Sequence, residues 1–224
     1  MPGHGVLLRL LAGPVGTLLL LVDVSVTGAL RPGYDAWREP ISALSLGPGG
    51  DLARVVLLLY AGAVAVHGHA LAEVMPRRAG PPGRWAARAV LATAATLLVV
   101  ALCVMDETTY GPHGAEIARR TVAGDVHIVA GAVLALLLVV HCLLAAAALR
   151  RAGAPGWALG SGGCALVGLV AVLGYALATN IGGPVGLFER AATVVSGVHG
   201  ALLTAWLLPA TRAASPAGQA REAG

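Results

Sequence analysis

The chain alternates between long apolar segments and short polar ones. A helix needs roughly 20 mostly apolar residues to cross a bilayer, and six stretches meet that length. They are about Val6–Leu30, Leu52–Val74, Ala86–Met105, Val122–Leu149, Trp157–Thr179 and Ala191–Leu208. Backbone N–H and C=O groups find no water in hydrocarbon, so each stretch must satisfy them internally as a helix. The pattern predicts an all-α, polytopic membrane protein folded as one six-transmembrane-helix bundle.

Composition excludes the main soluble classes. Of the 224 residues, 57% are hydrophobic and 12% are charged, and the mean hydropathy is +0.80. A soluble domain is about 45–50% apolar and about 25% charged, so a water-soluble globule, a disordered chain and a disulfide-stapled secreted domain all fit poorly. We predict a single transmembrane domain over residues 1–210 and a disordered cytoplasmic tail over residues 211–224, because the tail is small and polar.

The placement of arginine predicts the orientation. All 15 basic residues are arginine. Nine lie in the terminal segments and in the connections after the second and fourth stretches, and six lie in the other connections. The positive-inside rule makes the richer side cytoplasmic, so we expect a multi-pass plasma-membrane protein with both termini in the cytoplasm. Its expected partner is the lipid bilayer. Nucleic acid is not expected, because no basic run exceeds two adjacent residues. The oligomeric state is left open.

Polar and ionisable residues are concentrated on the predicted outer side. In the first outer loop, Pro40 and Gly47 bracket a short apolar segment, which predicts a short interfacial helix. An ionisable residue near the centre of a span costs roughly 2.5–3.5 kcal/mol, so Asp23 should face the bundle, with His127 and Arg119 or Arg120 as donors. The outer polar layer is Asp23, Asp106, Asp125, His127 and Asn180. It predicts either structural contacts between helices or a ligand, proton or metal site.

Histidines form a second, deeper layer. His67, His69 and His141 are expected at one depth in the inner third, with His199 near the middle of the last stretch. His127 and His141 are fourteen residues apart on one helix, a spacing used by bis-histidine b-type cytochromes. No other stretch repeats that spacing, so a second haem would lack a partner ligand. Haem b is therefore kept as an alternative and is not predicted.

Neither the cysteines nor the outer polar layer predicts a cofactor. Cys103, Cys142 and Cys164 all lie within apolar stretches, and an odd, intramembrane set gives neither a disulfide framework nor a metal spacing. We interpret them as small packing residues. Carboxylate and imidazole groups in the outer layer suit zinc, but no closely spaced ligand pair accompanies them, so zinc too is only an alternative.

Four short motifs occur at the expected helix boundaries. They are RPGYDAWREPISALSLG after the first stretch, VMDET ending the third, GDVHIVAGAV opening the fourth and GLFERAATVV opening the sixth. Together, from about Leu11 to Leu208, they resemble the domain-of-unknown-function family 998, small six-helix membrane proteins of bacteria and archaea. The family implies no established activity. Its recurrent positions add Tyr34, Asp35, Ser42, Glu189 and Arg190 to the candidate polar pocket.

Three function classes follow from these residues. The predicted one is an uncharacterised, non-enzymatic membrane protein that binds or moves a small molecule, lipid or proton through an outward-facing polar pocket. The first alternative is a membrane-embedded hydrolase or transferase, with or without a metal, using Asp23, Asp106 and His127. The second alternative is a b-type haem electron carrier. Catalytic residues and the ligand are left unassigned.

Overall fold

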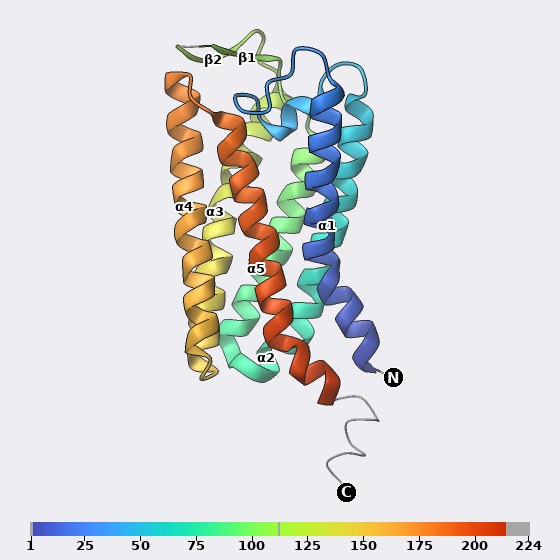
Figure 1. The fold of residues 1–224 in the computed structure, drawn as a ribbon, viewed down its shortest axis with the longest axis vertical. Helices are drawn as coiled ribbons and strands as arrows, with labels where there is room; N and C mark the ends of the chain where they lie inside the picture. The colour runs from blue at the N-terminus through green and yellow to red at the C-terminus, as the bar shows by residue number, and fades with distance from the viewer. Residues whose placement is uncertain (1, 112, 214–224) are drawn as a thin grey trace, which may run out of the picture.

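The computed structural model describes residues 2–111 and 113–213, and helices dominate this part of the chain (Figure 1). Five of the described helices are long and apolar enough to cross a membrane. They are α1 (Pro2–Leu30), α2 (Gly50–Leu102), α3 (Val122–Arg151), α4 (Pro155–Ile181) and α5 (Val185–Ala213). The architecture is therefore all-α, as the hydropathy pattern predicts.

The second helix, α2, explains why five helices stand where the sequence predicts six stretches. It is 53 residues long and contains one non-helical residue, Gly80, with φ 63° and ψ −149°. Glycine takes a positive φ at no steric cost. Pro81 and Pro82 follow, at the start of a helix where a missing N–H breaks no hydrogen bond. The chain turns back at Gly80, so that the predicted second and third stretches form two arms that run side by side (Figure 1).

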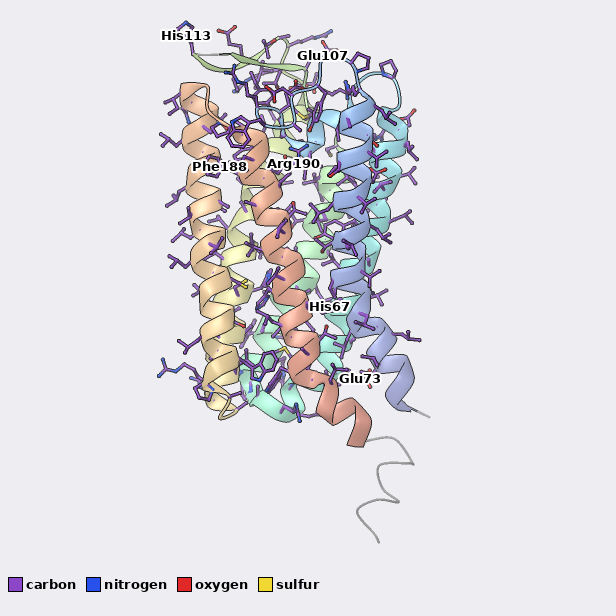
Figure 2. All side chains as sticks on the ribbon, in the orientation of Figure 1. His67, Glu73, Glu107, His113, Phe188 and Arg190 are labelled. Carbon is purple, nitrogen blue, oxygen red and sulfur yellow. The ribbon has the colours of Figure 1, made fainter. Side chains whose placement is uncertain are left out.

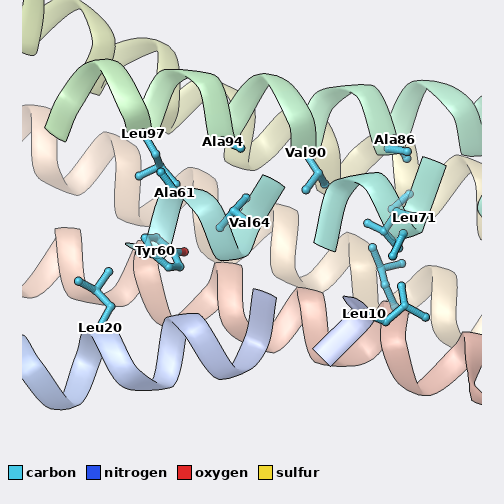
Figure 3. Packing of buried hydrophobic residues seen from close by; sticks show 14 of the residues in the cluster. Leu10, Leu20, Tyr60, Ala61, Val64, Leu71, Ala86, Val90, Ala94 and Leu97 are labelled. Carbon is cyan, nitrogen blue, oxygen red and sulfur yellow. The ribbon is translucent and has the colours of Figure 1, made fainter. Parts of the chain in front are cut away.

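The bundle core lies between α1, the two arms of α2, and α5. Ala61 and Val64 of the first arm face Val90 and Ala94 of the second, while Leu10 of α1 lies on the other side of the first arm (Figure 3). Small residues let helices approach closely in a membrane. Neighbouring helices pack in chain order, and α5 closes the bundle against α1.

The two ends of the bundle differ. One end carries the 3-10 helix η1 (Ile41–Ser45) and an antiparallel pair of strands, β1 (Thr108–Gly111) and β2 (Gly114–Ile117) (Figure 1). We call it the hairpin end. The other, the terminal end, carries the start of α1, the turn at Gly80 and the last turn of α5.

The segments outside the main helices differ in part from the prediction. The β1–β2 hairpin fills the loop between α2 and α3, whereas the hydropathy pattern predicts helices alone. The segment predicted as an interfacial helix is η1, whose first four residues are buried. At the other end of the chain, α5 continues to Ala213, so the predicted tail over 211–224 begins inside this helix, and its residues 214–224 lie outside the described residues.

Candidate functional site

Glu189 and Arg190, at the start of α5, fasten the first loop to the bundle. Arg190 donates from Nη1 to the carbonyl oxygen of Ala36 at 2.9 Å and from Nη2 to the hydroxyl of Tyr34 at 2.7 Å. The Glu189 carboxylate accepts from the N–H of Ile41, the first residue of η1. We call these five residues the loop clamp. Figure 2 shows Arg190 at the hairpin end, beneath the loops.

The polar side chains of the loop clamp form their hydrogen bonds with one another and with the backbone of the loop. The Tyr34 hydroxyl donates to the carbonyl of Pro40 at 3.1 Å, and burial raises the pKa of Tyr34, against the lowering effect of Arg190. The phenol therefore stays neutral and acts as a donor. A Cβ atom on Gly186 would lie 2.2 Å from the carbonyl oxygen of Glu39, so the loop can approach α5 only over a glycine.

Two other predicted residues of this loop have local roles. Asp35 Oδ1 accepts from the N–H of Trp37 at 2.9 Å and of Arg38 at 3.4 Å, a hydrogen-bonded turn of the kind aspartate favours. Its side chain is 52% exposed. Ser42 is buried within η1. Neither side chain joins the contacts between Arg190 and Tyr34.

Asp106 links the end of α2 to the start of α3. Its carboxylate accepts from the N–H of Thr121 at 3.0 Å and from the Thr121 hydroxyl at 2.6 Å. Thr121 Oγ1 in turn accepts from the N–H of Gly124 at 3.0 Å and caps α3. The two hydrogen bonds from Thr121 lower the pKa of Asp106. A carboxylate is also favoured near the N-terminus of a helix, so Asp106 has a sufficient structural role here.

This arrangement predicts a pH dependence of stability. Because the pKa of Asp106 is lowered in the folded protein, its charge stabilises the fold above the unfolded pKa of about 3.9. That contribution is lost as the pH falls through the lower, folded pKa. Thermal unfolding followed by circular dichroism should show Asp106→Asn less stable than the wild type at neutral pH, with a gap that narrows below about pH 4. A Glu107→Gln control should track the wild type, since Glu107 is exposed. A gap independent of pH would contradict this role.

His127 closes the same junction from α3. Its Nδ1 lies 3.1 Å from the carbonyl oxygen of Val100 and 2.7 Å from that of Cys103. Both atoms are acceptors, so Nδ1 carries the proton. The last carbonyls of a helix have no partner within it, and the His127 ring supplies one to the end of α2.

The other residues of the outer polar layer interact with residues four or five positions away in the sequence. Asp23 Oδ1 accepts from the Thr27 hydroxyl at 3.5 Å, and Asn180 donates to the carbonyl of Ala176 at 2.7 Å. Asp125 lies 3.9 Å from Arg120 Nη1, and its side chain is 56% exposed. The hydrogen bonds and ion pairs of the described residues thus do not join Asp23, Asp106 and His127 into one cluster.

Three histidines instead meet inside the bundle, toward the terminal end. His67 of α2 and His141 of α3 are each 4% exposed, and His199 of α5 is 1% exposed. They line a small space of about 20 Å³, the histidine cavity, with Thr17, Thr93 and Ser196. That volume accommodates one water-sized group. His69, predicted at the same depth as His67, faces away from the bundle.

A proline fixes the His67 tautomer. Pro14 has no N–H, so the carbonyl of Leu10, four residues earlier, has no donor within α1. His67 Nδ1 at 2.7 Å and the Thr204 hydroxyl at 3.0 Å supply the missing donors. His67 Nδ1 therefore carries the proton and its Nε2 keeps a lone pair. Figure 2 shows His67 between α1 and α5.

The other two rings lie against each other. The ring centroids of His141 and His199 are 4.9 Å apart, and His199 Nε2 is 3.2 Å from the hydroxyl of Ser161. His141 Nδ1 is buried and makes no hydrogen bond of ordinary geometry with any described residue. Its weaker contact is with the backbone of Leu137, and a buried polar atom without a good hydrogen bond is unfavourable, so this nitrogen is a candidate ligand atom.

Comparison with known proteins gives one match. The model of a family described as "Protein of unknown function (DUF998)" matches residues 14–213. That range includes the loop clamp, the Asp106–Thr121 junction and the three cavity histidines. No curated protein and no solved structure gives a significant match.

Proposed function

We propose a function for this chain, which belongs to the DUF998 family of proteins of unknown function: it admits a small ion from the hairpin end into the histidine cavity. The observation that carries the proposal is the meeting of three imidazoles, each at most 4% exposed, around a space of about 20 Å³. Ionisable groups are expensive inside a membrane protein and mark ion or substrate sites by default. A space of that size favours an ion over a lipid or a larger molecule.

The proposal includes a topology with six spans. A continuous helix of 53 residues would be about 80 Å long, against a hydrocarbon core of about 30 Å, so each arm of α2 crosses separately. The hairpin end, with η1 at the interface, faces outward from the plasma membrane, and both termini are cytoplasmic. Support comes from Arg78 over the Trp206 ring and Arg88 over the Trp85 ring, since tryptophan marks a membrane–water interface and an excess of arginine marks its cytoplasmic side.

A polar stripe on α5 supplies the route. Glu189, Thr193, Ser196 and Gly200 follow one another at intervals of four, three and four residues, which places them on one helix face. Thr193 is half-buried and Ser196 lines the cavity. Glu189 and His199 are separated by about 15 Å along the helix. The stripe therefore leads from the loop clamp to the cavity.

The enzyme and haem alternatives receive less support. Asp106 and His127 are held by Thr121 and by backbone carbonyls, and Asp23 bonds within α1, so no shared reaction centre forms among them. A haem is far larger than a cavity of about 20 Å³. A porphyrin between these histidines would have to separate the helices.

Silver-ion accessibility tests the route. Ser196→Cys is made with all three native cysteines replaced by alanine and reconstituted into sealed vesicles. External Ag⁺ is added, and the remaining thiol is labelled with a maleimide after denaturation. The matched control is Val198→Cys, since Val198 is 49% exposed on the lipid-facing side of α5 and a thiol in apolar surroundings resists ionisation. We expect protection at least about ten times faster for Ser196→Cys, because the thiolate is the metal ligand. Equal rates would contradict the route.

A further inference from the structure

We propose that His141, Cys142 and His199 bind one cuprous ion (Cu⁺) beside the histidine cavity. The ligand atoms, one ring nitrogen from each histidine and the Cys142 sulfur, all lie within 4.8 Å of one another. Metal–ligand bonds of about 2.0–2.3 Å place neighbouring ligand atoms about 3.5 Å apart. The longest separation therefore has to shorten by no more than about 1.3 Å when an ion binds.

The proposed ligand atoms are buried, and their hydrogen-bonding capacity is not fully used within the protein. Cys142 is 0% exposed, and His141 Nδ1 makes no hydrogen bond of ordinary geometry, only a weaker contact with the backbone of Leu137 four residues earlier. Both histidines also line the cavity of about 20 Å³, which provides space beside the ligands. A bound ion would give His141 Nδ1 a stronger partner than this weak contact.

Ser161 of α4 supports the site from outside. Its hydroxyl is 3.2 Å from His199 Nε2 and fixes the orientation of the ring. Metal-binding histidines usually carry such a partner on the second nitrogen, and this partner sets which nitrogen is free for the metal. The three proposed ligands come from two helices, and Ser161 adds a third to the surroundings of the ion.

Charge and ligand type select Cu⁺. Thiolate is a soft ligand that favours Cu⁺, zinc and iron–sulfur clusters, and imidazole suits copper and zinc. With neutral histidines, one thiolate balances the charge of Cu⁺, whereas Zn²⁺ would leave an uncompensated positive charge. Isolated charges are costly in a low-dielectric interior. None of the described residues that line the cavity is a carboxylate, so the second charge of zinc has no counter-ion there.

The copper site identifies the ion of the proposed function as Cu⁺. It rests on the proposed function only for the route by which the ion reaches the site. The full-length protein in detergent is titrated with Cu⁺ under reducing conditions, in competition with bathocuproine disulfonate. We expect about one Cu⁺ per chain. Removing a ligand should cost more than the roughly 10–100-fold in metal affinity lost with a second-shell partner, so Cys142→Ser should weaken binding about 100-fold or more. Cys103→Ser and His69→Gln are the controls and should bind as the wild type does.

X-ray absorption of the loaded wild-type protein needs no variant and reads the ligands directly. One sulfur and two nitrogen ligands on copper are expected. A copper site without sulfur, unchanged binding in Cys142→Ser, or one Zn²⁺ per chain that Cu⁺ does not displace would overturn the proposal. Copper binding without silver access at Ser196→Cys would overturn the route and keep the site. Silver access at Ser196→Cys without copper binding would overturn the copper site and keep the route.

Discussion

Replacing Gly186 with alanine should lower the free energy of unfolding by about 3 kcal/mol, the upper part of the range for overpacking. The added Cβ would lie 2.2 Å from the carbonyl oxygen of Glu39 and 2.5 Å from that of Ala36. Both are backbone atoms, so relief requires the whole loop to move away from α5. That movement would also break the hydrogen bond from Arg190 to Ala36.

Chemical unfolding in one detergent measures this effect. The control is Gly131→Ala, because a Cβ at Gly131 of α3 meets no atom within 4 Å. Alanine is the better helix former by about 1 kcal/mol, so Gly131→Ala should be neutral or slightly stabilising. Equal stability of the two variants would show that the loop is not packed on Gly186.

Arg190→Met should destabilise the protein by about 3 kcal/mol, because it removes two charge-assisted hydrogen bonds made by a half-buried side chain. The change removes the charge-assisted bonds to Ala36 and Tyr34, each worth about 1.5–3 kcal/mol. It also leaves the Glu189 carboxylate without its neighbouring positive charge. Arg190→Lys should recover only part of this loss, because an ammonium group lacks the planar fork of donors.

Hydrogen exchange locates the Arg190 effect. A peptide covering residues 34–46 should exchange much faster in Arg190→Met than in the wild type, whereas a peptide from the middle of α3 should not change. Arg38→Met is the matched control. Arg38 makes an exposed ion pair with Asp35 at 4.0 Å, and such pairs contribute about 0–1 kcal/mol. If Arg38→Met loosened the loop as much as Arg190→Met, the clamp would lose its assigned role.

Hydropathy predicts the helical segments well because length and apolarity alone decide whether a segment can cross a membrane. It does not decide how the helices face one another. Asp23 illustrates this: the sequence shows that its carboxylate needs a donor, and the expected donor was on another helix. Thr27, one turn away in α1, supplies the hydrogen bond instead.

The sequence picks out the residues of the candidate polar layer, but it does not identify their hydrogen-bond partners. Asp106 and Thr121 are fifteen residues apart, and nothing in the local pattern reveals that the hairpin between them brings the carboxylate to the start of α3. Glu189 and Arg190 were located by motif resemblance alone. Their partners in the first loop are mostly backbone groups, which no side-chain pattern can indicate.

The histidine cavity was partly foreseeable. Helix rise places His67 and His141 at one depth, but in an apolar helix no polar face shows which way each ring points. His67 and His69 are two residues apart, and only His67 faces inward. One overlooked signal was Pro14, which leaves the Leu10 carbonyl in need of a donor such as His67.

One measurement compares the loop clamp directly with the proposed copper site: the rise in unfolding temperature on adding Cu⁺. A ligand held only by the folded state stabilises it by about 2.7 kcal/mol at one hundred times its dissociation constant, and sites more than about 7–10 Å apart act additively. Arg190→Met should unfold at a lower temperature than the wild type yet show the same copper-induced rise, while Cys142→Ser, which binds about 100-fold more weakly or less, should show only a small fraction of that rise. A rise that Arg190→Met abolishes and Cys142→Ser retains would place the ligand at the loop clamp and contradict an interior site.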